Sequence, residues 1–128
     1  MEVSTIKSEK SYIIISDKKH SFSLTFQNLI SSINISASFQ DDIIKHSYKS
    51  NYNLDSLKKM NKYFLIYESI DEIYNDLILF LNKNQTKIIE KANIIQISIP
   101  IESMKIKEIL FELKKSEKND NEKYQEIN

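Results

Sequence analysis

Apolar and polar side chains alternate along the first half of the chain, with serine, threonine or asparagine between the apolar positions. The alternating apolar residues form two runs: Phe22, Leu24 and Phe26, then Ile33, Ile35, Ala37 and Phe39. A period of two is typical of strands that bury one face. We therefore predict two strands of an antiparallel meander that covers a core on one side only.

Two further strands are predicted to flank this pair. Residues 12–16 form a short isoleucine-rich run, and the turn-like residues 17–20 join it to the next strand. Ile44, His46 and Tyr48 alternate after a turn at Asp41-Asp42 and predict a fourth strand. Residues 1–10 are polar and mixed in charge, so we predict a flexible arm there.

The period changes to that of helices after Asn53. This residue can cap a first helix over 54–64, whose buried side we assign to Leu54, Leu57, Met60 or Asn61, and Phe64. A second helix over 69–81 begins with Ser69 and Glu72 at the spacing of a capping box, and Asp71 suits its positive end. Its apolar stripe has helical spacing: Ile70, Ile73, Tyr74, Leu77, Phe80 and Leu81. Residues 82–84 end it with asparagine where glycine is usual.

The last part of the chain returns to strands. Residues 86–90 and 94–99 predict a hairpin around 91–93, and Pro100 should lie at a strand end because it cannot donate to a ladder. Residues 106–113 fit either a helix or a strand. We favour the strand, because the preceding hairpin needs a neighbour. Residues 114–128 are nearly all charged or amide-bearing, which predicts a disordered tail.

This order of elements predicts an α+β fold: a small antiparallel β-sandwich or barrel with a helix-turn-helix inserted between strands. A chain of 128 residues is one domain's worth. We place the single globular domain at 11–113, between the arm and the tail.

The composition excludes several kinds of site. The chain has no Gly, no Cys and no Arg, a bias that an AT-rich genome would explain. Glycine-dependent phosphate loops, cysteine-ligated zinc and bidentate arginine sites are therefore absent in their usual forms. The formal net charge of zero disfavours nucleic acid as the main partner. No apolar run is long enough to cross a membrane and the first ten residues do not form a signal peptide, so we expect a cytoplasmic protein.

Candidate chemistry is sparse. His20 and His46, with Asp41 and Asp42 near the second, form a weak metal-site pattern, and we predict no metal, no cofactor and no catalytic residue. The protein is therefore predicted not to be an enzyme. The aromatic residues Tyr63, Phe64, Tyr67 and Tyr74 are interpreted mainly as the junction of helices and sheet. Our candidate partner-binding residues are Tyr63, Tyr67, Tyr74 and Phe80.

The stretch Leu57–Glu72, which reads Leu-Lys-Lys-Met-Asn-Lys-Tyr-Phe-Leu-Ile-Tyr-Glu-Ser-Ile-Asp-Glu, carries a resemblance together with the late isoleucine-rich strands. It resembles the globular heads of the centriolar cartwheel protein and of the DNA end-joining scaffolds, and also a module that recurs in proteins of AT-rich protists. The resemblance implies a β-sandwich or barrel head that acts through assembly surfaces. Those heads precede a coiled-coil stalk, whereas Glu117 and Asp120 stand here where a stalk needs apolar residues.

Two functions from different classes remain open. The first is a non-catalytic interaction or assembly module, of the cytoskeletal or centriolar scaffold type, that docks a protein partner or itself through an apolar patch or a sheet edge. The alternative is an accessory subunit of a nucleic-acid-associated complex that uses the sheet surface and the lysines.

Overall fold

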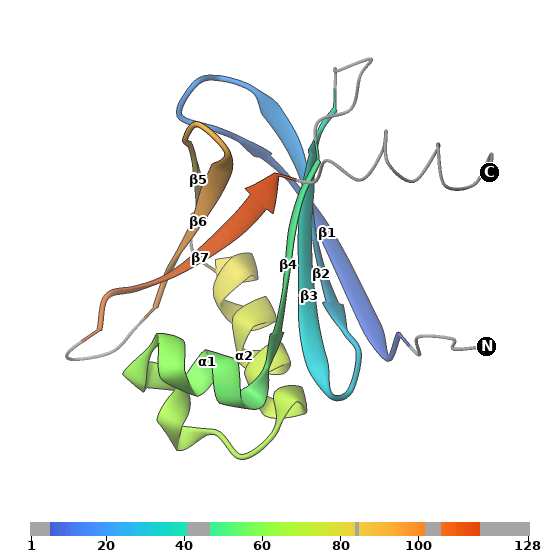
Figure 1. Ribbon diagram of the computed structural model, residues 1–128, viewed down its shortest axis with the longest axis vertical. Coiled ribbons are helices and arrows are strands. Elements are labelled where there is room, and N and C mark those ends of the chain that lie inside the picture. Colours follow the sequence, from blue (N-terminus) through green and yellow to red (C-terminus); the bar gives the residue numbers. More distant parts are fainter. Residues whose placement is uncertain (1–5, 41–46, 84, 102–105, 116–128) are drawn as a thin grey trace.

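The computed structural model describes residues 6–40, 47–83, 85–101 and 106–115. Its elements follow one another along the chain as shown in Figure 1: β1 (Ser8–Ile15), β2 (Ser21–Asn28), β3 (Ser32–Phe39), β4 (Ser47–Asn53), α1 (Leu54–Met60), the 3₁₀ helix η1 (Lys62–Ile66), α2 (Ile70–Lys83), β5 (Lys87–Glu90), β6 (Ile94–Pro100) and β7 (Glu108–Lys115). The predicted α+β class is confirmed, because the helices are inserted between two groups of antiparallel strands.

In the described ranges, the strands form one seven-stranded sheet in the order β1-β2-β3-β4-β7-β6-β5. The sheet curls until the turn between β1 and β2 reaches the β5–β6 hairpin, so the architecture is a nearly closed barrel (Figure 1). All neighbours are antiparallel. Because the number of strands is odd, the two edge strands β1 and β5 run in the same direction.

The core lies inside this curved sheet. β2 and β3 bury every second residue, as their alternation predicted, and β7 does the same from the other side of the barrel. β6 buries Ser98 in addition to Ile95, Ile97 and Ile99. Helix α2 contributes the predicted stripe: Ile70, Ile73, Tyr74, Leu77 and Leu81 are buried, while Phe80 is half-buried. Helix α2 lies between the two halves of the sheet in Figure 1 and covers the open side of the barrel with its apolar face.

The segment 54–64, predicted as one helix, forms two elements, α1 and η1. Asn53 caps α1 as expected, since its Oδ1 accepts a hydrogen bond from the backbone N–H of Ser56 at 2.8 Å. Asn61 then leaves the helical region, with φ −151° and ψ 131°, and its own side chain accepts from the N–H of Tyr63 at 2.8 Å. An asparagine that can cap competes with helix continuation, so η1 begins as a separate 3₁₀ helix.

The predicted capping box of α2 is confirmed in half. Ser69 Oγ accepts from the N–H of Glu72 at 3.2 Å. The Glu72 carboxylate accepts a hydrogen bond from the N–H of Glu68 at 2.9 Å. In a capping box it would instead accept from the N–H of the cap residue itself, Ser69. The helix ends at Lys83, and Asn84 lies outside the described residues.

Several strand boundaries differ from the predictions. β1 begins at Ser8, so residues 8–10, which we assigned to the arm, pair with β2 instead. β4 begins at Ser47, and the predicted turn and strand start at 41–46 lie outside the described residues. β7 is a strand, as favoured, and it takes in the first two residues of the predicted tail. Pro100 is the last residue of β6, as predicted.

Candidate partner-binding groove

Within the described part of the chain, backbone groups on the outer edge of β1 have no hydrogen-bond partner. The N–H of Ser16 donates to the carbonyl of His20 at 2.8 Å across the β1–β2 turn. Because bonded residues alternate along an antiparallel ladder, the even-numbered residues of β1 bond to β2. The N–H and C=O groups of the odd-numbered residues therefore point away from the sheet: Glu9, Ser11, Ile13 and Ile15.

The pairing of β2 with β3 supports this assignment independently. The N–H of Gln40 donates to the carbonyl of Ser21 at 2.9 Å, which places the odd-numbered residues of β2 in the ladder with β3. The even-numbered residues of β2 are left to bond β1. Among the described residues, nothing bonds the outward backbone groups of Ser11, Ile13 and Ile15.

Helix α2 runs alongside this edge in the same direction as β1. The Nζ of Lys7, just before β1, lies 2.8 Å from Asp71 Oδ2 in the first turn of α2. Further along both elements, the Tyr12 hydroxyl donates to Asn82 Oδ1 at 3.0 Å. The strand from Lys7 to Tyr12 and the helix from Asp71 to Asn82 each cover about 17 Å, so the two elements stay side by side between these contacts.

Asp71 is the anchor at the start of this arrangement. Its Oδ1 accepts from the side-chain amide of Asn28 at 2.8 Å, and the buried Asn28 also accepts from the N–H of Ile30. The hydrogen bonds from Lys7 and then from Asn28 lower the pKa of Asp71. The carboxylate thus ties α2 to β1 and to the β2–β3 turn.

Two hollows line the space between β1 and α2, and together they form what we name the β1–α2 groove. The first hollow, of about 390 Å³, is lined by Ser8, Glu9, Lys10, Tyr74, Asn75, Ile78 and Leu79. The second hollow, of about 380 Å³, is lined by Tyr12, Ile13, Ile14, Ile15, Leu81, Gln85 and Thr86. The walls carry exposed aliphatic side chains, since Ile13, Ile15 and Leu79 are 58%, 56% and 61% exposed. Thr86 Oγ1 is a buried atom for which the described part of the chain provides no hydrogen-bond partner.

The groove ends where β1 approaches β5. The N–H of Asp17 donates to the carbonyl of Ile88 at 3.0 Å, and Asp17 Oδ1 accepts from the N–H of Glu90 at 3.0 Å. In a parallel ladder, one residue donates its N–H to a carbonyl of the neighbouring strand, and its own carbonyl accepts from the N–H two residues further along that strand. At Asp17 the side-chain carboxylate takes the place of that backbone carbonyl. The edges of β1 and β5 therefore meet at Asp17 and separate along the rest of β1.

A serine, a histidine and a glutamate meet beside this contact. Ser16 Oγ donates to Glu90 Oε2 at 2.5 Å, and His20 Nδ1 lies 2.7 Å from the same oxygen. The glutamate side chain is only 8% exposed. A nucleophilic relay needs the histidine between the serine and the acid, whereas here the acid lies between the other two. The geometry fastens the β1–β2 turn to β5. His46 lies outside the described residues.

Three of the four predicted partner-binding residues lie together, away from the groove. The Tyr67 hydroxyl donates to Asp76 Oδ2 at 2.5 Å and is 2.9 Å from the Tyr63 hydroxyl. The Phe80 ring centre lies 6.2 Å from that of Tyr63. Tyr67 is 7% exposed, and its burial, with the Asp76 hydrogen bond, raises its pKa. These contacts join η1 to α2, and the predicted junction with the sheet is made by Phe64, whose ring centre lies 6.3 Å from that of Phe111. A partner role for Tyr63, Tyr67 and Phe80 stays a prediction.

Tyr74 is the one predicted partner-binding residue that lines the β1–α2 groove. Its ring lines the first hollow, and its hydroxyl donates to the carbonyl of Phe26 at 3.3 Å. Burial raises its pKa, and the negative charge of Glu9 adds to that shift. The groove residues Ile13, Ile15 and Leu79 were missed, although the run Ile13-Ile14-Ile15 carried a signal. Three consecutive isoleucines make both faces of a strand apolar, so the outward face is apolar too.

Comparisons with known proteins identify no relative. A scan of the chain against known protein families found no match, and a search of curated proteins found none either. Within the described ranges, no three His, Cys, Asp or Glu side chains are grouped to hold a metal ion. No helix in those same ranges has the length and apolarity to cross a membrane.

Proposed function

We propose that this chain is a non-catalytic interaction module that binds an extended segment of a partner protein in the β1–α2 groove, as a strand added to β1. The observation that carries this proposal is the outward backbone of Glu9, Ser11, Ile13 and Ile15 with a helix alongside it. Strand addition at such an edge draws its affinity from main-chain hydrogen bonds and its specificity from pockets for alternate side chains.

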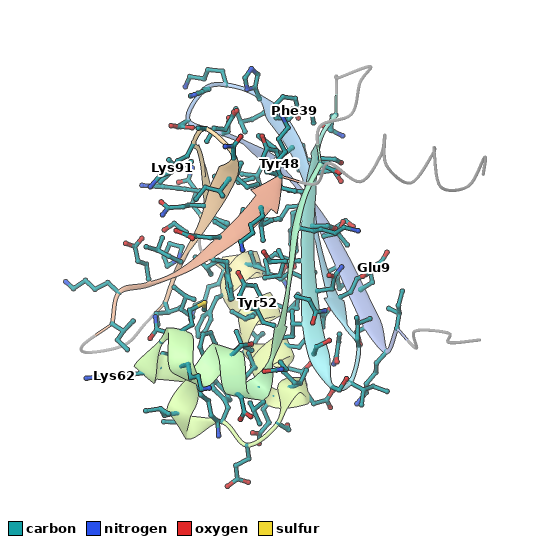
Figure 2. The ribbon with its side chains drawn as sticks, viewed as in Figure 1. Glu9, Phe39, Tyr48, Tyr52, Lys62 and Lys91 are labelled. Carbon is teal, nitrogen blue, oxygen red and sulfur yellow. The ribbon has the colours of Figure 1, made fainter. Side chains whose placement is uncertain are left out.

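The composition of the edge supports this proposal. Proteins usually protect an edge strand with inward charges, proline or a bulge. β1 pairs with β2 in unbroken register over its whole length, and its outer face ends in the exposed Ile13 and Ile15. Figure 2 shows Glu9 projecting from the β1 side of the molecule, so the charge on the outer face lies at the other end of the strand.

The walls of the groove favour an isolated segment over a second copy of β1. Residues of helix α2 line both hollows opposite β1. A second copy's β1 already has β2 along its other edge at all eight residues, and that β2 would meet α2. A linear tail or loop of a partner has no such neighbour.

The order of elements supports a scaffold role of the kind that the resemblance implies. Four strands, two α-helices and three strands follow one another in this chain. This order resembles the plan of the heads of the centriolar cartwheel protein and the DNA end-joining scaffolds, which have a helix-turn-helix between strands. Those heads act through assembly surfaces, and we propose that the β1–α2 groove is such a surface in this chain.

A titration followed by NMR tests the proposal. The probe is the acetylated and amidated peptide Thr-Val-Ile-Val-Thr-Thr-Glu-Thr, which favours an extended conformation. We expect the amide protons of Ser11, Ile13 and Ile15 to shift and to exchange more slowly with solvent when the peptide is added. Unchanged exchange at these amides up to millimolar peptide would contradict the proposal.

The matched variants are Ile13→Pro and Leu65→Ala. Proline at position 13 removes an outward N–H and keeps the bonds to β2, so the fold should persist while peptide binding is lost. Leu65 is an exposed aliphatic residue on η1, remote from the groove, and its alanine variant should bind like the unaltered chain. Equal loss in both variants would show that binding does not use the β1 edge.

A further inference from the structure

Building on the proposed function, we infer the direction and the chemistry of the bound segment. It runs antiparallel to β1, it places an aliphatic side chain in the second hollow, and it carries an acidic side chain four residues later beside Lys10.

The direction follows from the polarity of the two edge strands. β1 and β5 run the same way, because the sheet has an odd number of antiparallel strands. A segment antiparallel to β1 is also antiparallel to β5 and would be the eighth strand of an even-numbered barrel. Antiparallel ladders are slightly more stable per residue than parallel ones, and every existing neighbour in this sheet is antiparallel.

The pattern of side chains follows from the register. Directly opposite residues on paired strands point to the same face. The segment residue opposite Ile14 therefore enters the second hollow, where Leu81 forms the apolar wall. The residues on either side of it face Ile13 and Ile15 on the outer surface and gain most if they are β-branched. Two positions later, the segment passes the Tyr12–Asn82 hydrogen bond.

The charge of the segment follows from Lys10. This lysine lines the first hollow, and no described side chain forms an ion pair with it. The nearby acids are engaged: Asp71 with Lys7 and Asn28, and Glu9 with the amide of Gln27 at 2.8 Å. In an antiparallel segment the residue opposite Lys10 comes four positions after the one opposite Ile14. An acidic residue there pairs with Lys10 and rests its methylene groups on Ile78 and Leu79.

The carboxylate comes from a side chain rather than from a chain terminus. Capture of a terminal carboxylate uses a nest of converging backbone N–H groups. Around Lys10 the backbone is an extended strand, and the N–H groups of Ser8 and Lys10 belong to the ladder with β2. The segment therefore carries the acidic group as a side chain, with the pattern Val-Ile-Val-x-x-Glu or its aliphatic equivalents.

The test compares four peptides by the same NMR titration. The first is the probe above, the second is its reversed sequence, the third has Lys in place of Glu, and the fourth has Gln in place of Glu with a free terminal carboxylate. We expect the first to bind most tightly. Lys10→Glu should weaken its binding about fivefold, and the third peptide should recover that loss with the variant.

The outcomes separate this inference from the function on which it rests. Absence of binding by all four peptides, with no shift at Ser11 or Ile13, would overturn the proposed function itself. Equal binding of the forward and reversed peptides would overturn the direction and leave strand addition in place. Tighter binding of the fourth peptide would overturn the side-chain source of the carboxylate, and an unaltered affinity in Lys10→Glu would overturn the pairing with Lys10.

Discussion

The barrel opens at two junctions, β4–β7 and β1–β5, and the two differ in how their backbone groups are hydrogen-bonded. β4 and β7 pair at Tyr48↔Lys115 and Lys49↔Lys114 and then separate. Below that point Ser50 Oγ and Tyr52 Oη both donate to the carbonyl of Glu112, each at 2.8 Å. Figure 2 shows Tyr52 in this space between β4 and β7. At the other junction, Ser16, Asp17 and His20 of the β1–β2 turn bond to β5. Within the described ranges, the outward backbone groups of Ser11, Ile13 and Ile15 have no hydrogen-bond partner.

The larger of the two openings is the one that side chains of the same chain bridge with hydrogen bonds to a backbone carbonyl. The hollow at the β4–β7 junction has a volume of about 680 Å³, larger than that of either hollow of the β1–α2 groove. The carbonyl of Glu112, a residue that lines this hollow, already accepts hydrogen bonds from Ser50 and Tyr52, and the ring centre of Tyr52 lies 5.3 Å from that of Phe111. Antiparallel neighbours that diverge can be bridged by side chains from within. At the β1–β5 junction the side-chain bridges lie at one end of β1, so within the described residues the outward backbone groups of Ser11, Ile13 and Ile15 remain without a hydrogen-bond partner.

The largest expected effect on stability concerns the β4–β7 junction. Phe111 is fully buried and contacts the rings of Tyr52 and Phe64. Phe111→Ala should lower the free energy of unfolding by about 3–5 kcal/mol, because it leaves a cavity in the core. Urea unfolding measures this change, with the exposed neighbour Leu110→Ala as the control. Similar small losses in both variants would mean that packing does not hold β4 and β7 together.

The next effect tests the open edge. Ile14→Pro removes an N–H that bonds β2 and should cost about 3 kcal/mol of unfolding free energy. Ile13→Pro removes an outward N–H and should cost less than about 1 kcal/mol. Both are measured by urea unfolding at the same temperature. If the two variants are equally destabilised, the assignment of outward and inward residues in β1 is wrong.

A smaller effect is expected where β1 meets β5. Glu90→Ala removes the nearly buried acceptor of Ser16 and His20 and should lower the free energy of unfolding by about 2 kcal/mol. Glu90→Gln keeps an acceptor oxygen and should lose less. Amide exchange should also accelerate at Glu90, whose N–H bonds Asp17. A fully stable alanine variant would show that this contact does not hold the edges together.

The smallest effect is the pH dependence of the anchor at Asp71. Lys7 and Asn28 lower the pKa of this carboxyl in the folded chain. Its contribution to stability is therefore present above the unfolded pKa of about 4 and is lost as the pH falls through that value and below it. Asp71→Asn should flatten the stability profile between about pH 5 and pH 2, as measured by thermal unfolding. Lys7→Met should flatten it in part, since Asn28 remains. An unchanged profile in both variants would count against the anchor.

Local patterns predicted the elements well. The alternation in β2 and β3, the asparagine cap of α1 and the stripe of α2 all depend on residues within one or two turns of each other. The break at Asn61 was missed, because the same asparagine can continue a helix, end it or cap the next one. The start of β1 was missed because Ser8–Lys10 carry no apolar period of their own and depend on pairing with β2.

By itself, the sequence determined which residues favour strands, which favour helices and which side chains seek a core. The tertiary structure alone decided that β1 is an edge, that α2 lies beside it and that Asp17 stands in for a strand carbonyl. Strand order is set by pairing between residues far apart in the chain, which no local period encodes. For the same reason the run Ile13-Ile14-Ile15 predicts a strand with two apolar faces, while the position of that strand in the sheet leaves one of those faces exposed beside the groove.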